Sequence, residues 1–177
     1  MGPIGHALVS SAVGGGVWVA TGSLAAAGVT VAVGVLMDGD HMYDYYQRYA
    51  KGKYGKLYLP LHAWEYSLVG LGLLAVGLNH PIFLGVVLAH LAHVVSDHWH
   101  NGLNRFGYSI TYRAIKGFNF KNIVAQPEKA YARHEHSKLF AFDRRLALWV
   151  RATARGWFMR RAGGKHRQRP EAYQADD

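Results

Sequence analysis

Residues 7–37 read ALVSSAVGGGVWVATGSLAAAGVTVAVGVLM, a stretch that contains no charged side chain. Thr21-Gly22-Ser23 interrupts it near the middle, and we expect two helices joined by a tight turn at this point. Each helix would be short for a membrane span, which needs about 20 apolar residues. The many glycines suit close helix packing in lipid better than a water-exposed helix. We therefore favour a membrane hairpin, while a buried hairpin in a soluble protein stays open.

A second pair of apolar segments follows, from Leu61 to Leu78 and from Pro81 to about His98. Asn79-His80-Pro81 is the expected turn, because proline is favoured at the first position of a helix. Two such hairpins predict an all-α fold, a four-helix up-down membrane bundle. We expect this metal-binding bundle to occupy residues 1–118.

The chain after residue 118 is mixed polar and aromatic, and one long helix is expected from about Glu128 to Arg161. Its apolar stripe, opposed by arginines, is typical of an interfacial helix on anionic lipid. A soluble amphipathic helix folded over the mouth of the bundle is the alternative. We expect residues 119–162 to form this basic amphipathic helical tail and residues 163–177 to be disordered.

Positive charge is confined to two parts of the chain. Of the 20 Lys and Arg residues, none precedes Arg48, and residues 1–100 contain four. Basic residues on short loops tend to face the cytoplasm, so the 42–60 loop, the tail after residue 100 and both termini are expected there. A soluble nucleic-acid binder would require the apolar half to fold in water, and we expect no nucleic-acid partner. The chain has no cysteine, so any metal must be held by nitrogen and oxygen ligands.

Histidine, aspartate and glutamate residues gather at four places in the apolar half. In an up-down-up-down bundle, the start of the first helix, the end of the second, the start of the third and the end of the fourth lie together. The candidate ligands at these places are His6, Asp38, Asp40, His41, His62, Glu65, His90, His93 and Asp97.

Helical spacing supports a common target for these side chains. His90, His93 and Asp97 fall within about 60° of one another on one helix face, and His62 and Glu65, three residues apart, would share a face as well. Imidazole and carboxylate together suit zinc, manganese or iron. We expect one or two divalent ions, zinc first among them, with some members of the set orienting the ligands.

The order of these motifs resembles the bacterial membrane-bound metal-dependent hydrolase family, described as LexA-binding inner-membrane relatives. The resemblance covers about residues 4–118 and includes Tyr112-Arg113 and Gly117-Phe118. Many members read His-Arg-Gly-x-Thr-His-Ser at the third motif, where this chain has His-Ala-Trp-Glu-Tyr-Ser, so Glu65 replaces a ligand or marks a distinct subgroup. The motifs are Gly5-His6, Asp38-Gly39-Asp40-His41, His62-Ala63-Trp64-Glu65 and His93-Val94-Val95-Ser96-Asp97.

The resemblance implies a membrane-bound, metal-dependent hydrolase of bacteria, and the family's hydrolase label itself implies little about substrate. Our own expectation is a multi-pass protein of the inner membrane that hydrolyses a phosphoester or lipid-like ester at the cytoplasmic face. Membrane lipid and a small-molecule or lipid substrate are the expected partners. A metal would activate a bound water, with Glu65 or Asp38 as the general base. The alternative is a non-catalytic metal-binding membrane protein, a carrier or an assembly factor. A carrier should place its ligands near the midplane of the membrane, and clustering at one end favours the hydrolase.

Overall fold

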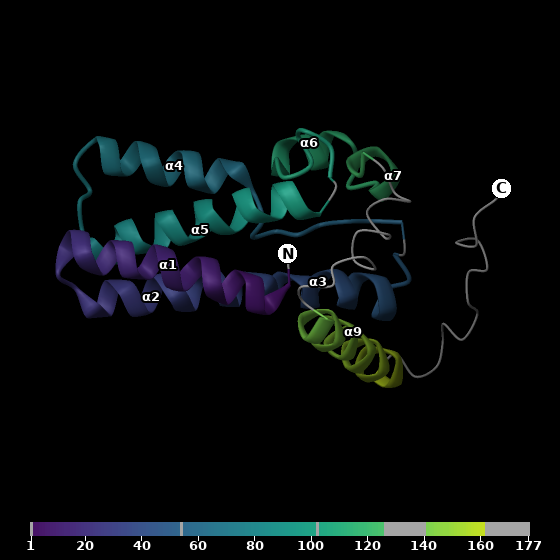
Figure 1. Ribbon diagram of the computed structural model, residues 1–177. Coiled ribbons are helices and arrows are strands. Elements are labelled where there is room, and N and C mark those ends of the chain that lie inside the picture. Colours follow the sequence, from purple (N-terminus) through teal and green to yellow (C-terminus); the bar gives the residue numbers. More distant parts are fainter. Residues whose placement is uncertain (1, 54, 102, 126–140, 162–177) are drawn as a thin grey trace.

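The computed structural model describes residues 2–53, 55–101, 103–125 and 141–161 (Figure 1). Within these ranges the chain is mostly helical and has no β-strand, which confirms the predicted all-α class. Four helices lie along one another and form the longer part of the molecule: α1 (Pro3–Thr21), α2 (Leu24–Leu36), α4 (Trp64–Ala75) and α5 (Pro81–His100).

The first hairpin has its turn where the sequence predicts it. Gly22 ends α1 with a φ of 68°, a left-handed conformation that glycine adopts without strain. The hydroxyl of Ser23 then caps α2 by accepting a hydrogen bond from the Ala26 amide. A Cβ on Gly34 would collide with the side chain of Ser10 on α1. Small residues therefore allow α1 and α2 to approach closely.

Helix α5 is the centre of the bundle. It packs against α1 and α2 on one side and against α4 on the other (Figure 1). It begins at Pro81, as predicted, with the His80 ring accepting a hydrogen bond from the Ile82 amide. Gly85 lies so close to Ala26 that an added Cβ would stand 2.9 Å from the Ala26 carbonyl oxygen. Backbone contact between α5 and α2 thus depends on this glycine.

Helix α4 is shorter than expected, running from Trp64 to Ala75 rather than over 61–78. Side chains from other segments bind the backbone of residues 58–62 and keep it out of the helix.

Two helices, α1 and α5, are long and apolar enough to cross a membrane, with mean hydropathies of 1.2 and 1.3. Helices α2 and α4 contain 13 and 12 residues, fewer than the roughly 20 that a full span needs. Length and composition thus identify two candidate spans in the described residues.

Short elements gather at one end of the bundle (Figure 1). The chain leaves α2 through the 3₁₀ turn η1 (Met37–Asp40), α3 (His41–Tyr45) and the π-helical turn η2 (Tyr46–Ala50). Two more helices, α6 (Ile110–Ile115) and α7 (Phe120–Ile123), lie at this end. Helix α9 (Ala141–Arg161) contacts α1, α3 and η2 here. It corresponds to the predicted C-terminal helix, whose expected first part, from Glu128, and the 163–177 tail lie outside the described residues.

Candidate metal centre

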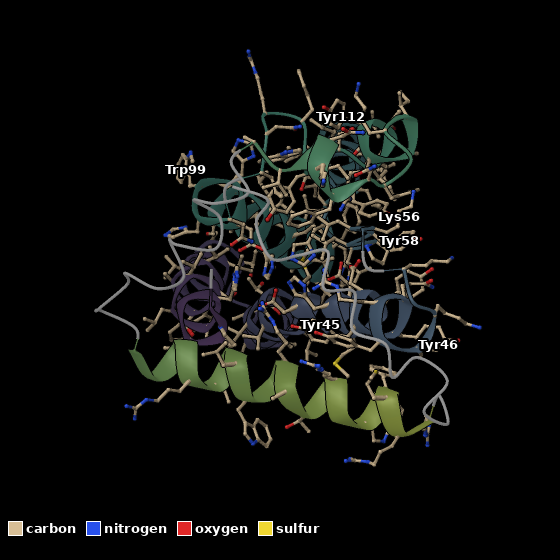
Figure 2. All side chains as sticks on the ribbon, turned by 90° about the vertical axis from the view of Figure 1, so that its right-hand side faces the viewer. Tyr45, Tyr46, Lys56, Tyr58, Trp99 and Tyr112 are labelled. Carbon is tan, nitrogen blue, oxygen red and sulfur yellow. The ribbon has the colours of Figure 1, made fainter. Side chains whose placement is uncertain are left out.

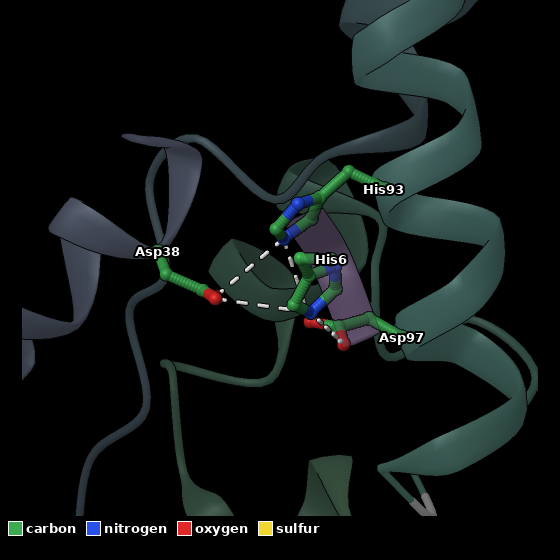
Figure 3. Close-up of side chains that lie close together, drawn as sticks. All are labelled: His6, Asp38, His93 and Asp97. Carbon is green, nitrogen blue, oxygen red and sulfur yellow. Dashed lines mark ion pairs between the residues drawn. The ribbon is translucent and has the colours of Figure 1, made fainter. Parts of the chain in front are cut away.

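Histidine and aspartate side chains from four segments converge at the end of the bundle that holds η1 and α3. His6 comes from the second turn of α1, Asp38 from η1, and His93 and Asp97 from α5 (Figure 3). One ligand atom from each of these four residues lies within 4.8 Å of the others. His41 and His62 form a second group with Asp38 that satisfies the same distance. Asp38 is therefore shared by two groups, each able to hold a metal ion.

The first group consists of His6, Asp38, His93 and Asp97. The rings of His6 and His93 stack with centroids 3.8 Å apart and planes inclined by 12°. Nε2 of His6 lies 3.0 Å from Asp97 Oδ1 and 3.8 Å from Asp38 Oδ2. Nε2 of His93 lies 3.5 Å from Asp38 Oδ1 and 3.8 Å from Asp97 Oδ2. Two imidazoles and two carboxylates thus direct possible ligand atoms into one small volume.

The second group adds His41 and His62 around the other side of Asp38. Asp38 Oδ1 lies 3.4 Å from Nε2 of His41 and 3.6 Å from Nε2 of His62. Nε2 of His62 is also 2.9 Å from Nε2 of His93 and 3.3 Å from Asp97 Oδ2. These contacts make the six residues one continuous cluster.

Hydrogen bonds on the far side of two rings fix which nitrogen carries the proton. Nδ1 of His62 lies 2.9 Å from Asp40 Oδ2, and Nδ1 of His93 lies 2.7 Å from the Gly34 carbonyl oxygen. Both partners accept, so each Nδ1 donates its N–H, and in the neutral rings each Nε2 lone pair faces the cluster. Partners of this kind orient histidine ligands in metal sites and set their tautomer.

Burial divides the cluster into a closed side and an open side. His6, His62, His93 and Asp97 are almost completely buried. Asp38 and His41 keep 23% and 36% of their side-chain surface exposed. Solvent therefore reaches the cluster past Asp38 and His41, which is the side on which a substrate or a water would enter.

The charges of the cluster stabilise one another strongly. Burial alone would raise the pKa of Asp38, but hydrogen bonds from His41, His62 and His93 hold it well below its usual value. Burial alone would lower the pKa of His62, but hydrogen bonds to Asp38, Asp40 and Asp97 raise it well above its usual value. The metal-free cluster therefore attracts a proton, and the same carboxylates would attract a metal cation.

The donor spacing fits a metal ion. Two ligands of one ion, each about 2.0–2.2 Å from it, stand roughly 3.0–3.5 Å apart in octahedral or tetrahedral geometry. Most of the separations between Nε2 and carboxylate oxygen in the cluster lie at or slightly above this range. Both ring nitrogens of His6 are buried without a hydrogen-bond partner within the described part of the chain. A bound cation would satisfy Nε2, whose present neighbour is the Asp97 carboxylate.

The backbone that carries His62 is held by two carboxylates of the preceding segment. Asp40 Oδ2 accepts hydrogen bonds from the Leu61 amide, at 2.8 Å, and from the His62 ring. Asp44 accepts from the amides of Tyr58 and Leu59, at 2.7 and 2.8 Å. Leu59 has a φ of 43°, a left-handed value unusual for a residue other than glycine. Asp40, which the sequence predicts as a ligand, thus supports His62. It belongs neither to the group of four residues nor to the group of three.

Arg113 holds the same segment from the opposite side. Its guanidinium is fully buried and donates to the carbonyl oxygens of Leu59, at 3.0 Å, and His62, at 2.7 Å. The sequence did not single out Asp44 or Arg113 as site residues. The signal for Arg113 was that Tyr112-Arg113 formed part of the family resemblance. The signal for Asp44 was its position as a single aspartate among tyrosines.

Two predicted site residues point elsewhere. Nδ1 of His90 lies 2.6 Å from the Ser67 hydroxyl, and its Nε2 lies 3.0 Å from the Leu61 carbonyl oxygen. Glu65 accepts hydrogen bonds from the Ser109 hydroxyl and from the amides of Ile110 and Thr111, at the start of α6. The structure therefore brings neither His90 nor Glu65 into the cluster.

Comparisons of the chain with known protein families, curated proteins and solved structures find no match in any of the three. The resemblance to the membrane-bound hydrolases therefore stays a prediction from the motifs. The geometry itself defines a buried histidine and aspartate cluster that can hold a metal ion.

Proposed function

We propose that the protein is a metal-dependent hydrolase of the membrane surface and that the histidine and aspartate cluster is its active site. The observation that carries the proposal is the pair of Nε2 atoms of His62 and His93, which face each other at 2.9 Å while both Nδ1 atoms donate elsewhere. Two lone pairs at this distance repel unless a proton lies between them or a metal cation binds them. Asp38 and Asp97 supply the negative charge that favours such a cation.

The ligand assignment follows the two groups. His6, His93 and Asp97 would hold one ion, and His41 and His62 would hold a second, while the Asp38 carboxylate between the two groups would stay free to accept a proton. Zinc is the ion we expect first, because imidazole and carboxylate ligands without cysteine suit it. Manganese and iron accept the same ligands.

The chemistry assigned to the site is hydrolysis of a phosphoester or a lipid-like ester. A divalent ion supplies a Lewis acid and a bound water of lowered pKa. Asp38 is the cluster carboxylate that solvent reaches, so we assign it the acceptance of the proton from an attacking water. Glu65, the other base expected from the sequence, is used in capping α6.

A membrane location is supported by the surfaces of α1 and α5. In the most apolar 18 residues of α1 and of α5, only 28% and 33% of the residues are buried, whereas the core helix of a soluble protein is mostly buried. Every Lys and Arg of the chain lies in residues 48–56 or after residue 104, and the described ones belong to segments at the cluster end or to α9. We therefore propose that α1 and α5 cross the bacterial inner membrane, that the shorter α2 and α4 return the chain through it beside them, and that the cluster and both termini face the cytoplasm.

Activity of the reconstituted protein tests this function. Wild type, His93→Ala and the control His80→Ala would be compared in lipid nanodiscs against a phosphodiester and a panel of phosphoesters and lipid esters. His80 is a suitable control because it is exposed in the turn before α5. We expect turnover by wild type and His80→Ala and at least a 100-fold loss in His93→Ala. Bound metal without turnover of any substrate in the panel would favour a carrier or an assembly factor instead.

A further inference from the structure

Helix α9 is attached to the rest of the protein along one narrow face. Ala154 and Phe158 are buried, and the Phe158 ring lies 5.8 Å from that of Tyr46 on η2. The remaining described side chains of α9 are exposed or partly exposed. Among them, Trp149, Trp157 and Val150 expose 64%, 41% and 37% of their surface. So much exposed apolar surface on one helix needs an explanation other than packing against this chain.

The periodicity of the helix separates the exposed residues into two flanks. Successive residues turn by 100°, so Val150 and Trp157 lie on one side of the buried Ala154–Phe158 line. Arg151 and Arg155 lie on the other side. Leu146 falls on the same flank as Val150 and Trp157, and Trp149 lies farther round, opposite the buried line. Arg160 and Arg161 also fall on the side of Val150 and Trp157, and Leu148, 49% exposed, falls on the side of Arg151 and Arg155. We call the side that carries Val150 and Trp157 the apolar flank and the side that carries Arg151 and Arg155 the basic flank.

The direction of each flank follows from the way α9 crosses the molecule. Figure 2 looks along the bundle from the end that holds the cluster, and α9 runs across this view below the rest of the chain, from its start on the left to its end on the right. In a right-handed helix so placed, with Ala154 and Phe158 directed upward, the flank of Val150 and Trp157 points away from the viewer. It therefore faces the side on which the apolar hairpins extend, and Arg151 and Arg155 face the opposite side.

The charge of α9 complements an anionic surface. Residues 141–161 contain six arginines and one aspartate. The five arginines whose side chains are described form no ion pair with any described acidic residue. Trp157 and Arg161 stack, with the guanidinium 4.0 Å from the ring centroid. Tryptophan and arginine side by side suit the boundary between headgroups and acyl chains, where the ring sits in the interface and the charge meets lipid phosphate.

We propose that α9 is an interfacial helix lying on the anionic headgroup region of the bilayer that holds α1 and α5. Its axis runs across the cluster end of the bundle (Figure 2), its apolar flank enters the acyl boundary, and its basic flank remains in water and headgroups. This inference rests on the membrane location proposed above. A lipid surface is favoured over a protein partner because the apolar flank faces the side on which the proposed bilayer lies.

The absence of cysteine from the chain allows a direct test with single spin labels. Thr153→Cys lies on the apolar flank and Ala152→Cys lies 100° away toward the basic side, and both positions are exposed. Val19→Cys, 84% exposed toward the far end of α1, reports the lipid-facing surface of the proposed span, and Thr111→Cys, exposed at the start of α6, reports water. The labelled full-length protein would be reconstituted in nanodiscs of phosphatidylcholine with or without phosphatidylglycerol.

Collision with oxygen, which enters lipid, and with a water-soluble nickel chelate gives the depth of each label. We expect the Thr153→Cys label to resemble Val19→Cys, and Ala152→Cys to resemble Thr111→Cys, in discs with phosphatidylglycerol. Without the anionic lipid, nickel access to the Thr153→Cys label should rise several-fold.

Several results would overturn the inference, and each has a different meaning. Equal nickel access to the Thr153→Cys and Ala152→Cys labels, with Val19→Cys buried in lipid, would refute the interfacial helix and leave the membrane location intact. If nickel access to the Thr153→Cys label is low with or without phosphatidylglycerol, the preference for anionic lipid is refuted. Spin–spin broadening between copies would assign the flank to a second copy of the chain. Nickel access to Val19→Cys would refute the membrane location together with the inference.

Discussion

The Nε2 atoms of His62 and His93 lie 2.9 Å apart, while Nδ1 of each ring is held by an acceptor outside the cluster. Neither ring can turn its protonated nitrogen toward the other without losing the bond to Asp40 or Gly34. The metal-free protein can resolve the conflict by placing a proton between the rings, and bound metal would resolve it by engaging each Nε2 lone pair. Cation binding in the cluster therefore depends on the contacts that hold α2, α5 and the 58–62 segment together.

The first prediction concerns Asp40, which orients His62. Asp40→Asn keeps the size of the side chain but removes the charge that stabilises the Nδ1 proton of His62. Loss of such a partner typically costs 10- to 100-fold in metal affinity. We expect a loss of this size for zinc, measured by competition with a chelating dye. His80→Ala should match wild type, and an unchanged affinity in Asp40→Asn would contradict the orienting role.

The second prediction concerns pH. The pKa of His62 is raised in the folded, metal-free protein. Its proton therefore contributes stability that is fully present below the unfolded pKa of about 6.5 and is lost as pH rises through the raised value. Metal must displace this proton, so affinity for zinc should increase with pH until the raised pKa is passed. Thermal unfolding should show the stability of the metal-free protein falling over the same range, with a smaller change when metal is bound. A metal affinity that is flat with pH would contradict this account.

The third prediction concerns Arg113, which supports the segment that carries His62. Arg113→Met would leave the carbonyl oxygens of Leu59 and His62 buried without donors. Each unpaired buried group costs about 1–3 kcal/mol, so the loss of both bonds should lower the free energy of unfolding in detergent by roughly 2–6 kcal/mol. Arg105→Met is the control, because Arg105 is exposed. Equal stability of the two variants would show that Arg113 does not support the segment.

The fourth prediction concerns the contact between α1 and α2. Gly34→Ala would drive a methyl group into Ser10 and should cost about 1–3 kcal/mol of stability. Gly28→Ala on the same helix meets no atom within 4 Å and should be neutral or stabilising, because alanine favours helix over glycine by about 1 kcal/mol. The difference between the two unfolding midpoints measures the close approach. Similar midpoints would mean that the helices are not packed at Gly34.

The sequence predicts the parts of the site that depend on helix order. Gly22 and Pro81 mark turns that the structure contains, and antiparallel neighbours then place helix ends together. That reasoning correctly anticipates that His6, His41, His62, His93 and Asp97 lie in one place. It also places Asp38 there, as the expected proton acceptor, and only the structure shows that Asp38 belongs to both groups.

The remaining site features depend on contacts between residues far apart in the sequence, which the spacing of residues along one helix cannot predict. His62 and Glu65 would share a face only if the helix began before residue 62, and α4 begins at Trp64. His90 shares a helix with His93, but Ser67 of α4 and the Leu61 carbonyl oxygen engage its ring. Arg113 reaches His62 from 51 positions away, a pairing that only the folded chain reveals.

Metal content of the purified full-length protein tests the central claim most directly. Wild type, His80→Ala and His93→Ala would be purified in parallel, equilibrated with zinc, freed of loosely bound metal and analysed by mass spectrometry. We expect at least one ion per chain in wild type and His80→Ala and a loss of most of that metal in His93→Ala. A metal-free wild type, or a His93→Ala variant that keeps the full metal content, would contradict the central claim.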